Sequence, residues 1–107
     1  MNLRANEKKA LGRLKNILQE QGDFVDLWIF GSKAKGSSTK ESDIDVMIVV
    51  RENGQALQSM VDDVVFDLNL QHDCLISAIV LSQEEIEHGP MSESPFYKAA
   101  IHDGVRL

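Results

Sequence analysis

Two short apolar segments, each joined to a polar motif at one end, constrain this chain more than any other feature. The segment Phe24–Phe30 is rich in aromatic and β-branched side chains and is followed by a predicted turn of small residues that starts at Gly31, whereas Ile44–Val50 begins directly after Asp43. Both segments have the length and composition of buried β-strands. Gly31 leaves room for phosphate oxygens to approach the backbone, and Asp43 and Asp45 project together because alternate strand residues share a face. The two motifs predict a site for a metal-bound nucleoside triphosphate.

The residues around these motifs supply ligands for both parts of such a site. Ser32 offers a hydroxyl and a backbone amide, and Lys33 or Lys35 adds positive charge beside it. A spaced pair of aspartates suits Mg²⁺, which keeps several waters and prefers one or two protein carboxylates together with substrate phosphates. We therefore expect Mg²⁺ to be the cofactor and Asp43 and Asp45 to be its ligands.

Two other phosphate- and metal-binding motifs do not fit. Gly31 and Gly36 have the spacing of a P-loop, but serines stand where that motif requires lysine and Ser/Thr. Asp43 does not open a calcium-binding loop, because residues 46–48 are apolar where further oxygen ligands are needed. The magnesium–triphosphate interpretation is therefore preferred.

Length and composition favour one small domain. With 107 residues, of which 43% are hydrophobic and 26% charged, the sequence predicts a single domain over residues 1–107 with no separate substrate domain. A net charge of -6 disfavours direct binding of nucleic acid. Cys74 is the only cysteine, and neither a signal-peptide segment nor a membrane span is evident, so we expect a cytoplasmic protein without a membrane partner.

The remaining hydrophobic patterns predict helices around a small sheet. Asn6 is expected to cap a first helix that stops at Gly22. Further along the chain, the expected elements are a helix over Gln55–Leu70, a strand over Cys74–Leu81, a short acidic helix after Ser82, and a last helix from Ser94-Pro95 to near Gly104. The expected fold class is α/β (α+β), with a small mixed sheet of three to four strands flanked by helices.

The second and third strands should be parallel because a helix connects them. Their starts would then lie side by side, so Asp43 and Asp45 should face the segment His72–Leu75. Any further catalytic carboxylate is expected there. His72 and Cys74 also share a strand face, but two ligands without a second His/Cys cluster do not make a zinc site.

A known family shares the central motifs. This chain resembles the signature of that family at Gly31-Ser32, Ala34, Gly36 and Ser42-Asp43-Ile44-Asp45. This signature belongs to the nucleotidyltransferases of the DNA polymerase β superfamily, specifically the minimal stand-alone type. The resemblance implies that a hydroxyl of an acceptor attacks the α-phosphorus and releases pyrophosphate. It assigns magnesium to Asp43 and Asp45, and it assigns nucleotide binding to Gly31 and Ser32. We expect Lys33 and Ser42 to be further nucleotide-binding residues.

The resemblance also implies a third carboxylate on the next strand. Aligning the apolar run of residues 76–80 with that of family members puts Leu75 at the position of this acid. Asp73 shares a strand face with Leu75, so a small shift of the strand start would let Asp73 serve as the third catalytic residue. The sequence leaves both alternatives open.

The resemblance supports three hypotheses about function. In the first, the chain transfers AMP from ATP to a hydroxyl on a small helical HEPN-type protein, as the antitoxin of a toxin–antitoxin pair, and forms a hetero-oligomer with it. In the second, it is a catalytically degenerate relative that acts by binding alone. A third, modification of a small molecule such as an aminoglycoside, is disfavoured because a chain of 107 residues leaves no second domain to form the pocket.

Overall fold

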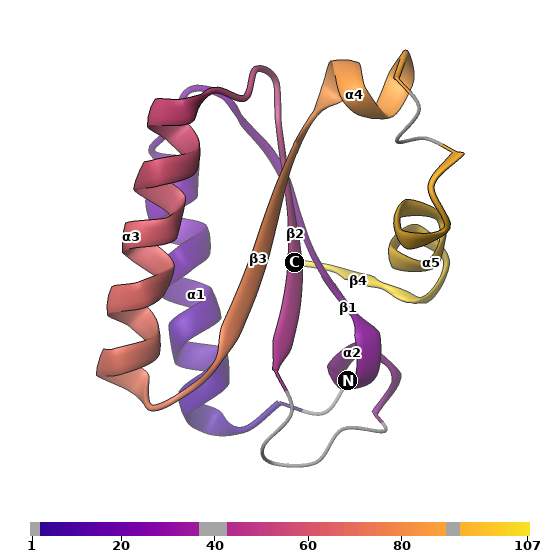
Figure 1. Ribbon diagram of the computed structural model, residues 1–107. Coiled ribbons are helices and arrows are strands. Elements are labelled where there is room, and N and C mark those ends of the chain that lie inside the picture. Colours follow the sequence, from indigo (N-terminus) through magenta and orange to yellow (C-terminus); the bar gives the residue numbers. More distant parts are fainter. Residues whose placement is uncertain (1–2, 37–42, 90–92) are drawn as a thin grey trace.

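The computed structural model describes residues 3–36, 43–89 and 93–107 (Figure 1). Along the chain the elements are α1 (Ala5–Gln19), β1 (Phe24–Phe30), α2 (Gly31–Lys35), β2 (Ile44–Val50), α3 (Gln55–His72), β3 (Ile76–Ser82), α4 (Gln83–Glu87), α5 (Pro95–Asp103) and β4 (Val105–Arg106). Among these residues, no helix combines the length and the apolar character needed to cross a bilayer.

The four strands form one mixed sheet in the order β3-β2-β1-β4. Strand β2 pairs antiparallel with β1 and parallel with β3, as its helical connection through α3 predicted. The short strand β4 adds to the free edge of β1 in antiparallel orientation. The expected α/β (α+β) fold with a small mixed sheet is therefore confirmed.

Helices cover the two faces of the sheet unequally. Helices α1 and α3 lie together on one face, while α4 and α5 lie on the other (Figure 1). The larger core lies under α1 and α3, where alternate residues of β2 such as Ile44 and Val46 pack against Leu14 and Val61 with no exposed surface. The smaller core contains Met47 and other apolar residues of the opposite face. The sheet face that carries Asp45 is therefore the less covered one.

Asn6 does not cap the first helix, and that prediction was wrong. The N-cap of α1 is Arg4, so Asn6 lies within the first turn. Its side-chain amide donates to the backbone carbonyls of His72 at 2.8 Å and Asp73 at 3.1 Å. The amide therefore ties the start of α1 to the end of α3, a long-range contact that a local pattern cannot indicate.

The connection from α3 to β3 also differs from expectation. Helix α3 continues two residues beyond Leu70, and β3 begins at Ile76 instead of Cys74. Asp73 is the C-cap of α3 and adopts a left-handed conformation with φ 50°. A helix that runs on to His72 leaves only residues 73–75 for the turn, so the strand starts late.

A buried ion pair joins α1 to α2. The Lys33 ammonium lies 3.1 Å from Oε2 of Glu7, and both side chains are almost completely buried. Glu7 Oε1 also accepts a hydrogen bond from the backbone N–H of Arg4 at 2.8 Å. Burial raises the pKa of Glu7, but the Arg4 N–H and the Lys33 charge outweigh it, so the pKa of this carboxyl is lowered overall. The pair thus fixes the segment that follows β1.

Replacing Glu7 with glutamine should lower the free energy of unfolding by about 3–5 kcal/mol at neutral pH, because Lys33 loses its carboxylate partner inside the protein. The pKa of Glu7 is lowered on folding from 4.5, so its contribution is complete above pH 4.5 and disappears as the pH falls through the folded pKa. The difference between wild type and Glu7→Gln should therefore shrink below pH 4.5. Urea titrations at several pH values measure it.

Two further variants control this experiment. Glu20→Gln changes an exposed residue at the end of the same helix and should alter stability by less than about 0.5 kcal/mol. The double variant Glu7→Leu/Lys33→Met removes both buried charges and should be more stable than Glu7→Gln. Equal stability of Glu7→Gln and wild type at pH 7 would contradict the structural role of the pair.

Candidate active site

Gly31 and Asp45 meet where β1 ends. The β1–β2 register places Phe30 opposite Asp45, so the next residue, Gly31, lies beside the Asp45 side chain. Gly31 has φ +74°, and a Cβ built on it would lie 2.6 Å from Oδ2 of Asp45. Only glycine combines this left-handed backbone with so close an approach of a carboxylate. The two motifs predicted from the sequence are therefore parts of one site.

Asp43 and Asp45 form the acidic part of the site. Ile44 between them is fully buried, which directs the two carboxylates to the opposite face of the sheet. Asp43 is exposed and Asp45 partly buried. Burial and the nearby charge of Asp43 raise the pKa of the Asp45 carboxyl. Two carboxylates that repel each other at one site are a donor set that fits a divalent cation such as Mg²⁺.

The start of β3 brings no acid to this pair. In the parallel register Ile44 lies opposite Ile76 and Asp45 opposite Ser77, so Leu75 is the neighbour of Asp43. The Ile44 N–H donates to the Leu75 carbonyl at 2.7 Å. In residues 3–36, 43–89 and 93–107, no group of three His, Cys, Asp or Glu side chains could hold a metal ion. Of the two alternatives for the third position, Leu75 is the one that the register places beside Asp43.

Asp73 is held elsewhere by its backbone. It is exposed at the end of α3, and its carbonyl accepts the hydrogen bond from Asn6. Asp73 does not form with Asp43 and Asp45 a group of side chains close enough together to hold one metal ion. The structure thus does not bring Asp73 together with Asp43 and Asp45, because the late start of β3 separates it from the strand.

Asn69 sets this strand start and was missed by sequence reasoning. Its Oδ1 accepts the Ile76 N–H at 2.7 Å, and its Nδ2 donates to the Ile76 carbonyl at 3.2 Å. The Cys74 thiol also donates to Asn69 Oδ1 at 3.6 Å, and Cys74 is buried as expected. The sequence signal for this contact was an asparagine in the last turns of a helix, because this side chain readily forms hydrogen bonds with nearby backbone.

The expected nucleotide-binding residues fall in different places. Gly31 and Ser32 open α2, a short helix where the sequence predicted a turn. The Lys33 side chain is buried, and its ammonium pairs with the Glu7 carboxylate of α1. The expectation that its ammonium binds phosphate does not agree with this burial. Ser42 lies outside the described residues.

A cavity opens beside Asp45. It has a volume of about 290 Å³, and Phe30, Ser77 and Ile79 contribute to its walls. Ser77 and Ile79 belong to β3 and share the sheet face with Asp45. The carboxylates therefore border a concave surface of mixed polar and apolar character, as small-molecule sites generally do.

The family follows from a comparison with known sequences. The family model described as "Polymerase beta, Nucleotidyltransferase" matches residues 12–89. The Methanocaldococcus jannaschii protein named "Putative protein adenylyltransferase MJ0604" is 38% identical over 81 residues, which cover 74% of this chain and 77% of that protein. This chain belongs to the polymerase beta nucleotidyltransferase family, which is a family of enzymes.

Solved structures share the same fold. "Crystal structure of the toxin-antitoxin with AMP-PNP" matches with a TM-score of 0.63 and 14% identity, over 92% of this chain and 70% of that chain. "Structure of putative minimal nucleotidyltransferase" matches with a TM-score of 0.60 and 16% identity, over 100% of this chain and 97% of that chain. The predicted minimal nucleotidyltransferase type of fold is confirmed.

Comparing Gly31→Ala with Gly36→Ala should separate the effect of backbone strain from the effect of a contact between the new Cβ and the Asp45 carboxylate. Both glycines have positive φ, of 74° and 76°, so each substitution should cost about 1–2 kcal/mol of folding free energy, measured by urea unfolding. Only at Gly31 would the new Cβ meet the Asp45 carboxylate, whereas at Gly36 none of the described residues lies within 4 Å of the new Cβ. We expect ATP with Mg²⁺ to raise the Tm of the wild-type chain by binding beside the acidic pair, and Gly31→Ala should lose that rise.

Gly36→Ala serves as the control and should keep most of that rise. An equal response of the two variants to ATP with Mg²⁺ would show that the contact between Gly31 and Asp45 does not shape the binding site.

Proposed function

We propose that this chain transfers AMP from ATP to a hydroxyl group of a partner protein, with Mg²⁺ as cofactor. The observation that carries the proposal is the contact between Gly31 and the Asp45 carboxylate, which joins the small-residue turn to the acidic pair. The relative named as an adenylyltransferase supports AMP as the transferred group and a protein as the acceptor. A single domain over residues 1–107 is part of this proposal.

Asp43 and Asp45 would hold the metal, which when bound neutralises charge on the phosphates and on the two carboxylates. The residues of the turn have a separate task. Gly31 lets the triphosphate approach the backbone, and Ser32 follows it at the start of α2. The cavity beside Asp45 would hold another part of the nucleotide against Phe30 and Ile79.

The transfer itself makes one bond and breaks one. The acceptor hydroxyl oxygen forms a bond with the α-phosphorus, and the bond from that phosphorus to the bridging oxygen breaks to release pyrophosphate. The hydroxyl proton must leave the acceptor oxygen. Asp43 is the more exposed of the two carboxylates and so the one nearer to solvent, through which this proton can depart. Catalysis of this kind depends mainly on positioning and charge balance.

The structural relatives suggest the kind of partner. The solved structure described above as a toxin-antitoxin with AMP-PNP shares the fold of this chain. We propose a small helical HEPN-type protein as acceptor, held in a hetero-oligomer, with this chain as the antitoxin. The net charge of -6 favours a partner with a basic surface.

A second candidate function is binding without transfer. It is favoured by the register of β3, which places Leu75 and Ser77 beside Asp43 and Asp45 where neither can supply a carboxylate. A chain of this kind would bind nucleotide and partner and silence the partner by covering it.

Mass spectrometry distinguishes the two candidates. The chain is purified together with the protein encoded by the adjacent gene, and Mg²⁺ is added with each nucleoside triphosphate in turn. We expect the partner to gain the mass of one AMP with ATP and none with Asp43→Asn/Asp45→Asn, because that variant lacks both carboxylates of the acidic pair.

A control keeps a negative result interpretable. Size-exclusion chromatography shows whether the Asp43→Asn/Asp45→Asn variant still binds the partner. A stable complex that gains no mass with any triphosphate would exclude transfer and favour the binding function.

Leu75→Asp tests whether the absence of a third carboxylate limits the rate of AMP transfer. The substitution adds a carboxylate next to Asp43 at a residue that is 56% exposed, so the fold should accept it. If the missing acid limits turnover, the rate of AMP transfer should rise by about tenfold or more, since general-base groups contribute about 10²–10⁴-fold. The measurement is the initial rate of partner modification.

Leu70→Asp provides the matched control, because Leu70 is also an exposed leucine but lies on α3. It should leave the rate unchanged. An unchanged rate in Leu75→Asp would show that the two carboxylates are sufficient.

A further inference from the structure

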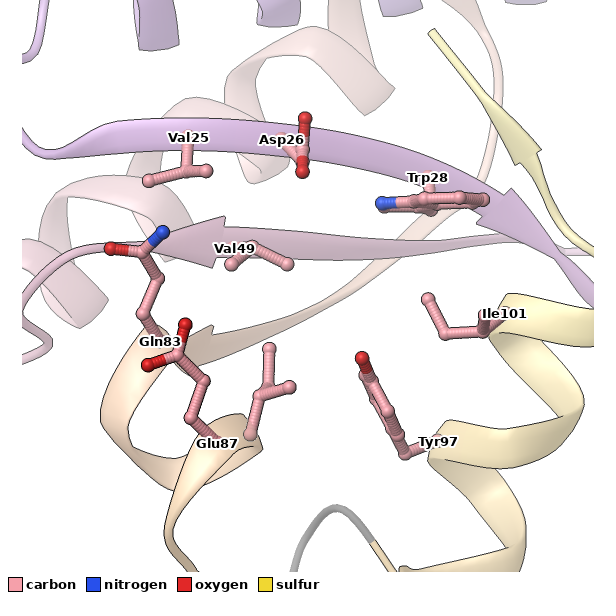
Figure 2. A pocket seen from close by; sticks show the side chains of 9 residues that line it. Val25, Asp26, Trp28, Val49, Gln83, Glu87, Tyr97 and Ile101 are labelled. Atoms are coloured by element: carbon pink, nitrogen blue, oxygen red, sulfur yellow. The ribbon is translucent and has the colours of Figure 1, made fainter.

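A second cavity lies on the same sheet face as Asp45, toward the other end of β2. Its volume is about 180 Å³, and residues of β1, β2, α4 and α5 line it (Figure 2). Val49 is the β2 residue in its wall. Val49 is four residues from Asp45, which corresponds to about 13 Å along a strand. The cavity is therefore distinct from the candidate active site, although a single bound protein could reach both.

A β-bulge shapes the β1 wall of this cavity. The pairing shifts between Phe24↔Val50 and Asp26↔Val49, so Val25 is an extra residue in β1. Bulges of this kind redirect side chains. Here Val25 and Asp26, although adjacent in sequence, both line the cavity. The bulge thus places a carboxylate beside apolar neighbours on the sheet.

The charges of the cavity favour a cation. Figure 2 shows Asp26 on β1 and Glu87 on α4 on different sides of the cavity. Asp26 already pairs with Arg106 of β4 at 2.7 Å, which balances its charge. Glu87 is 62% exposed and lies 3.8 Å from the His88 ring. Among the described lining residues there is no lysine or arginine, so Glu87 leaves the cavity attractive to one positive charge.

The aromatic residues favour a flat cation on an alkyl chain. Trp28 lies in the β1 wall, and the Tyr97 side chain points from α5 toward the sheet (Figure 2). A guanidinium group stacks on such rings better than an ammonium group does. Ile86 and Ile101 supply apolar surface for the methylenes of its stem.

We propose that this cavity binds an alkyl guanidinium group, either as an arginine side chain of a partner protein or as a small free guanidinium compound. A triphosphate is a poorer occupant, because Glu87 would repel it. If the guanidinium belongs to a protein, that protein is the acceptor of AMP in the proposed function. This part of the inference rests on the proposed function. The binding site itself does not depend on catalysis.

Trp28 is the only tryptophan of the chain, so its fluorescence reports directly on the cavity. At low ionic strength the protein is titrated with N-acetyl-arginine amide, ethylguanidinium, the neutral N-acetyl-citrulline amide, and ATP with Mg²⁺. We expect a saturable change with an arginine or guanidinium probe and none with citrulline. Glu87→Gln should weaken binding about fivefold, and Tyr97→Leu should weaken it as well. Glu84→Gln, on the same helix but outside the lining, should not.

The probes also identify the source of the cation. Stronger binding of the capped arginine than of ethylguanidinium would indicate a protein-borne side chain, and the reverse would indicate a free compound. An equal response to citrulline or unchanged binding in Glu87→Gln would overturn the proposal. So would a response to ATP with Mg²⁺ without a response to either guanidinium probe. None of these measurements requires AMP transfer, so they stand apart from a failure of the proposed function.

Discussion

The buried ion pair between Glu7 and Lys33 is the interaction on which the site depends. It joins the first helix to the short helix that follows Gly31, and both charges are removed from water. Such a pair contributes little net stability over apolar residues of the same size, but it is costly to break one side of it. Its effect is therefore to hold α2 in one position against α1. The turn at Gly31 is placed by this contact.

Because of the position of that turn, the Asp45 carboxylate lies close to Gly31 as well as near the carboxylate of Asp43. Gly31 approaches the Asp45 carboxylate so closely that no side chain fits, while Asp43 adds a second negative charge nearby. Burial and this charge both disfavour the ionised form of Asp45. A site of this kind gains from a bound cation, which is why the pair suits metal-dependent nucleotidyl transfer.

Sequence patterns predicted the elements well where the signal was local. The strands Phe24–Phe30 and Ile44–Val50 have the bounds that their apolar runs indicated, and the connecting helix implied the parallel pairing of β2 with β3. Predictions failed where long-range hydrogen bonds decided. Asn6 reaches across to the end of α3 instead of capping α1, and Asn69 holds Ile76 so that β3 begins late. Neither contact leaves a periodic trace in the sequence.

The family and the acidic pair could be predicted from Gly31-Ser32 and Asp43-Ile44-Asp45, because these are short motifs whose geometry follows from a turn and from strand alternation. The residues that accompany these motifs depend on tertiary contacts. Lys33 is buried against Glu7, and the β2–β3 register places Leu75 beside Asp43 while Asp73 remains at the helix end. Burial and strand register depend on contacts between residues far apart in the chain, which local patterns do not encode.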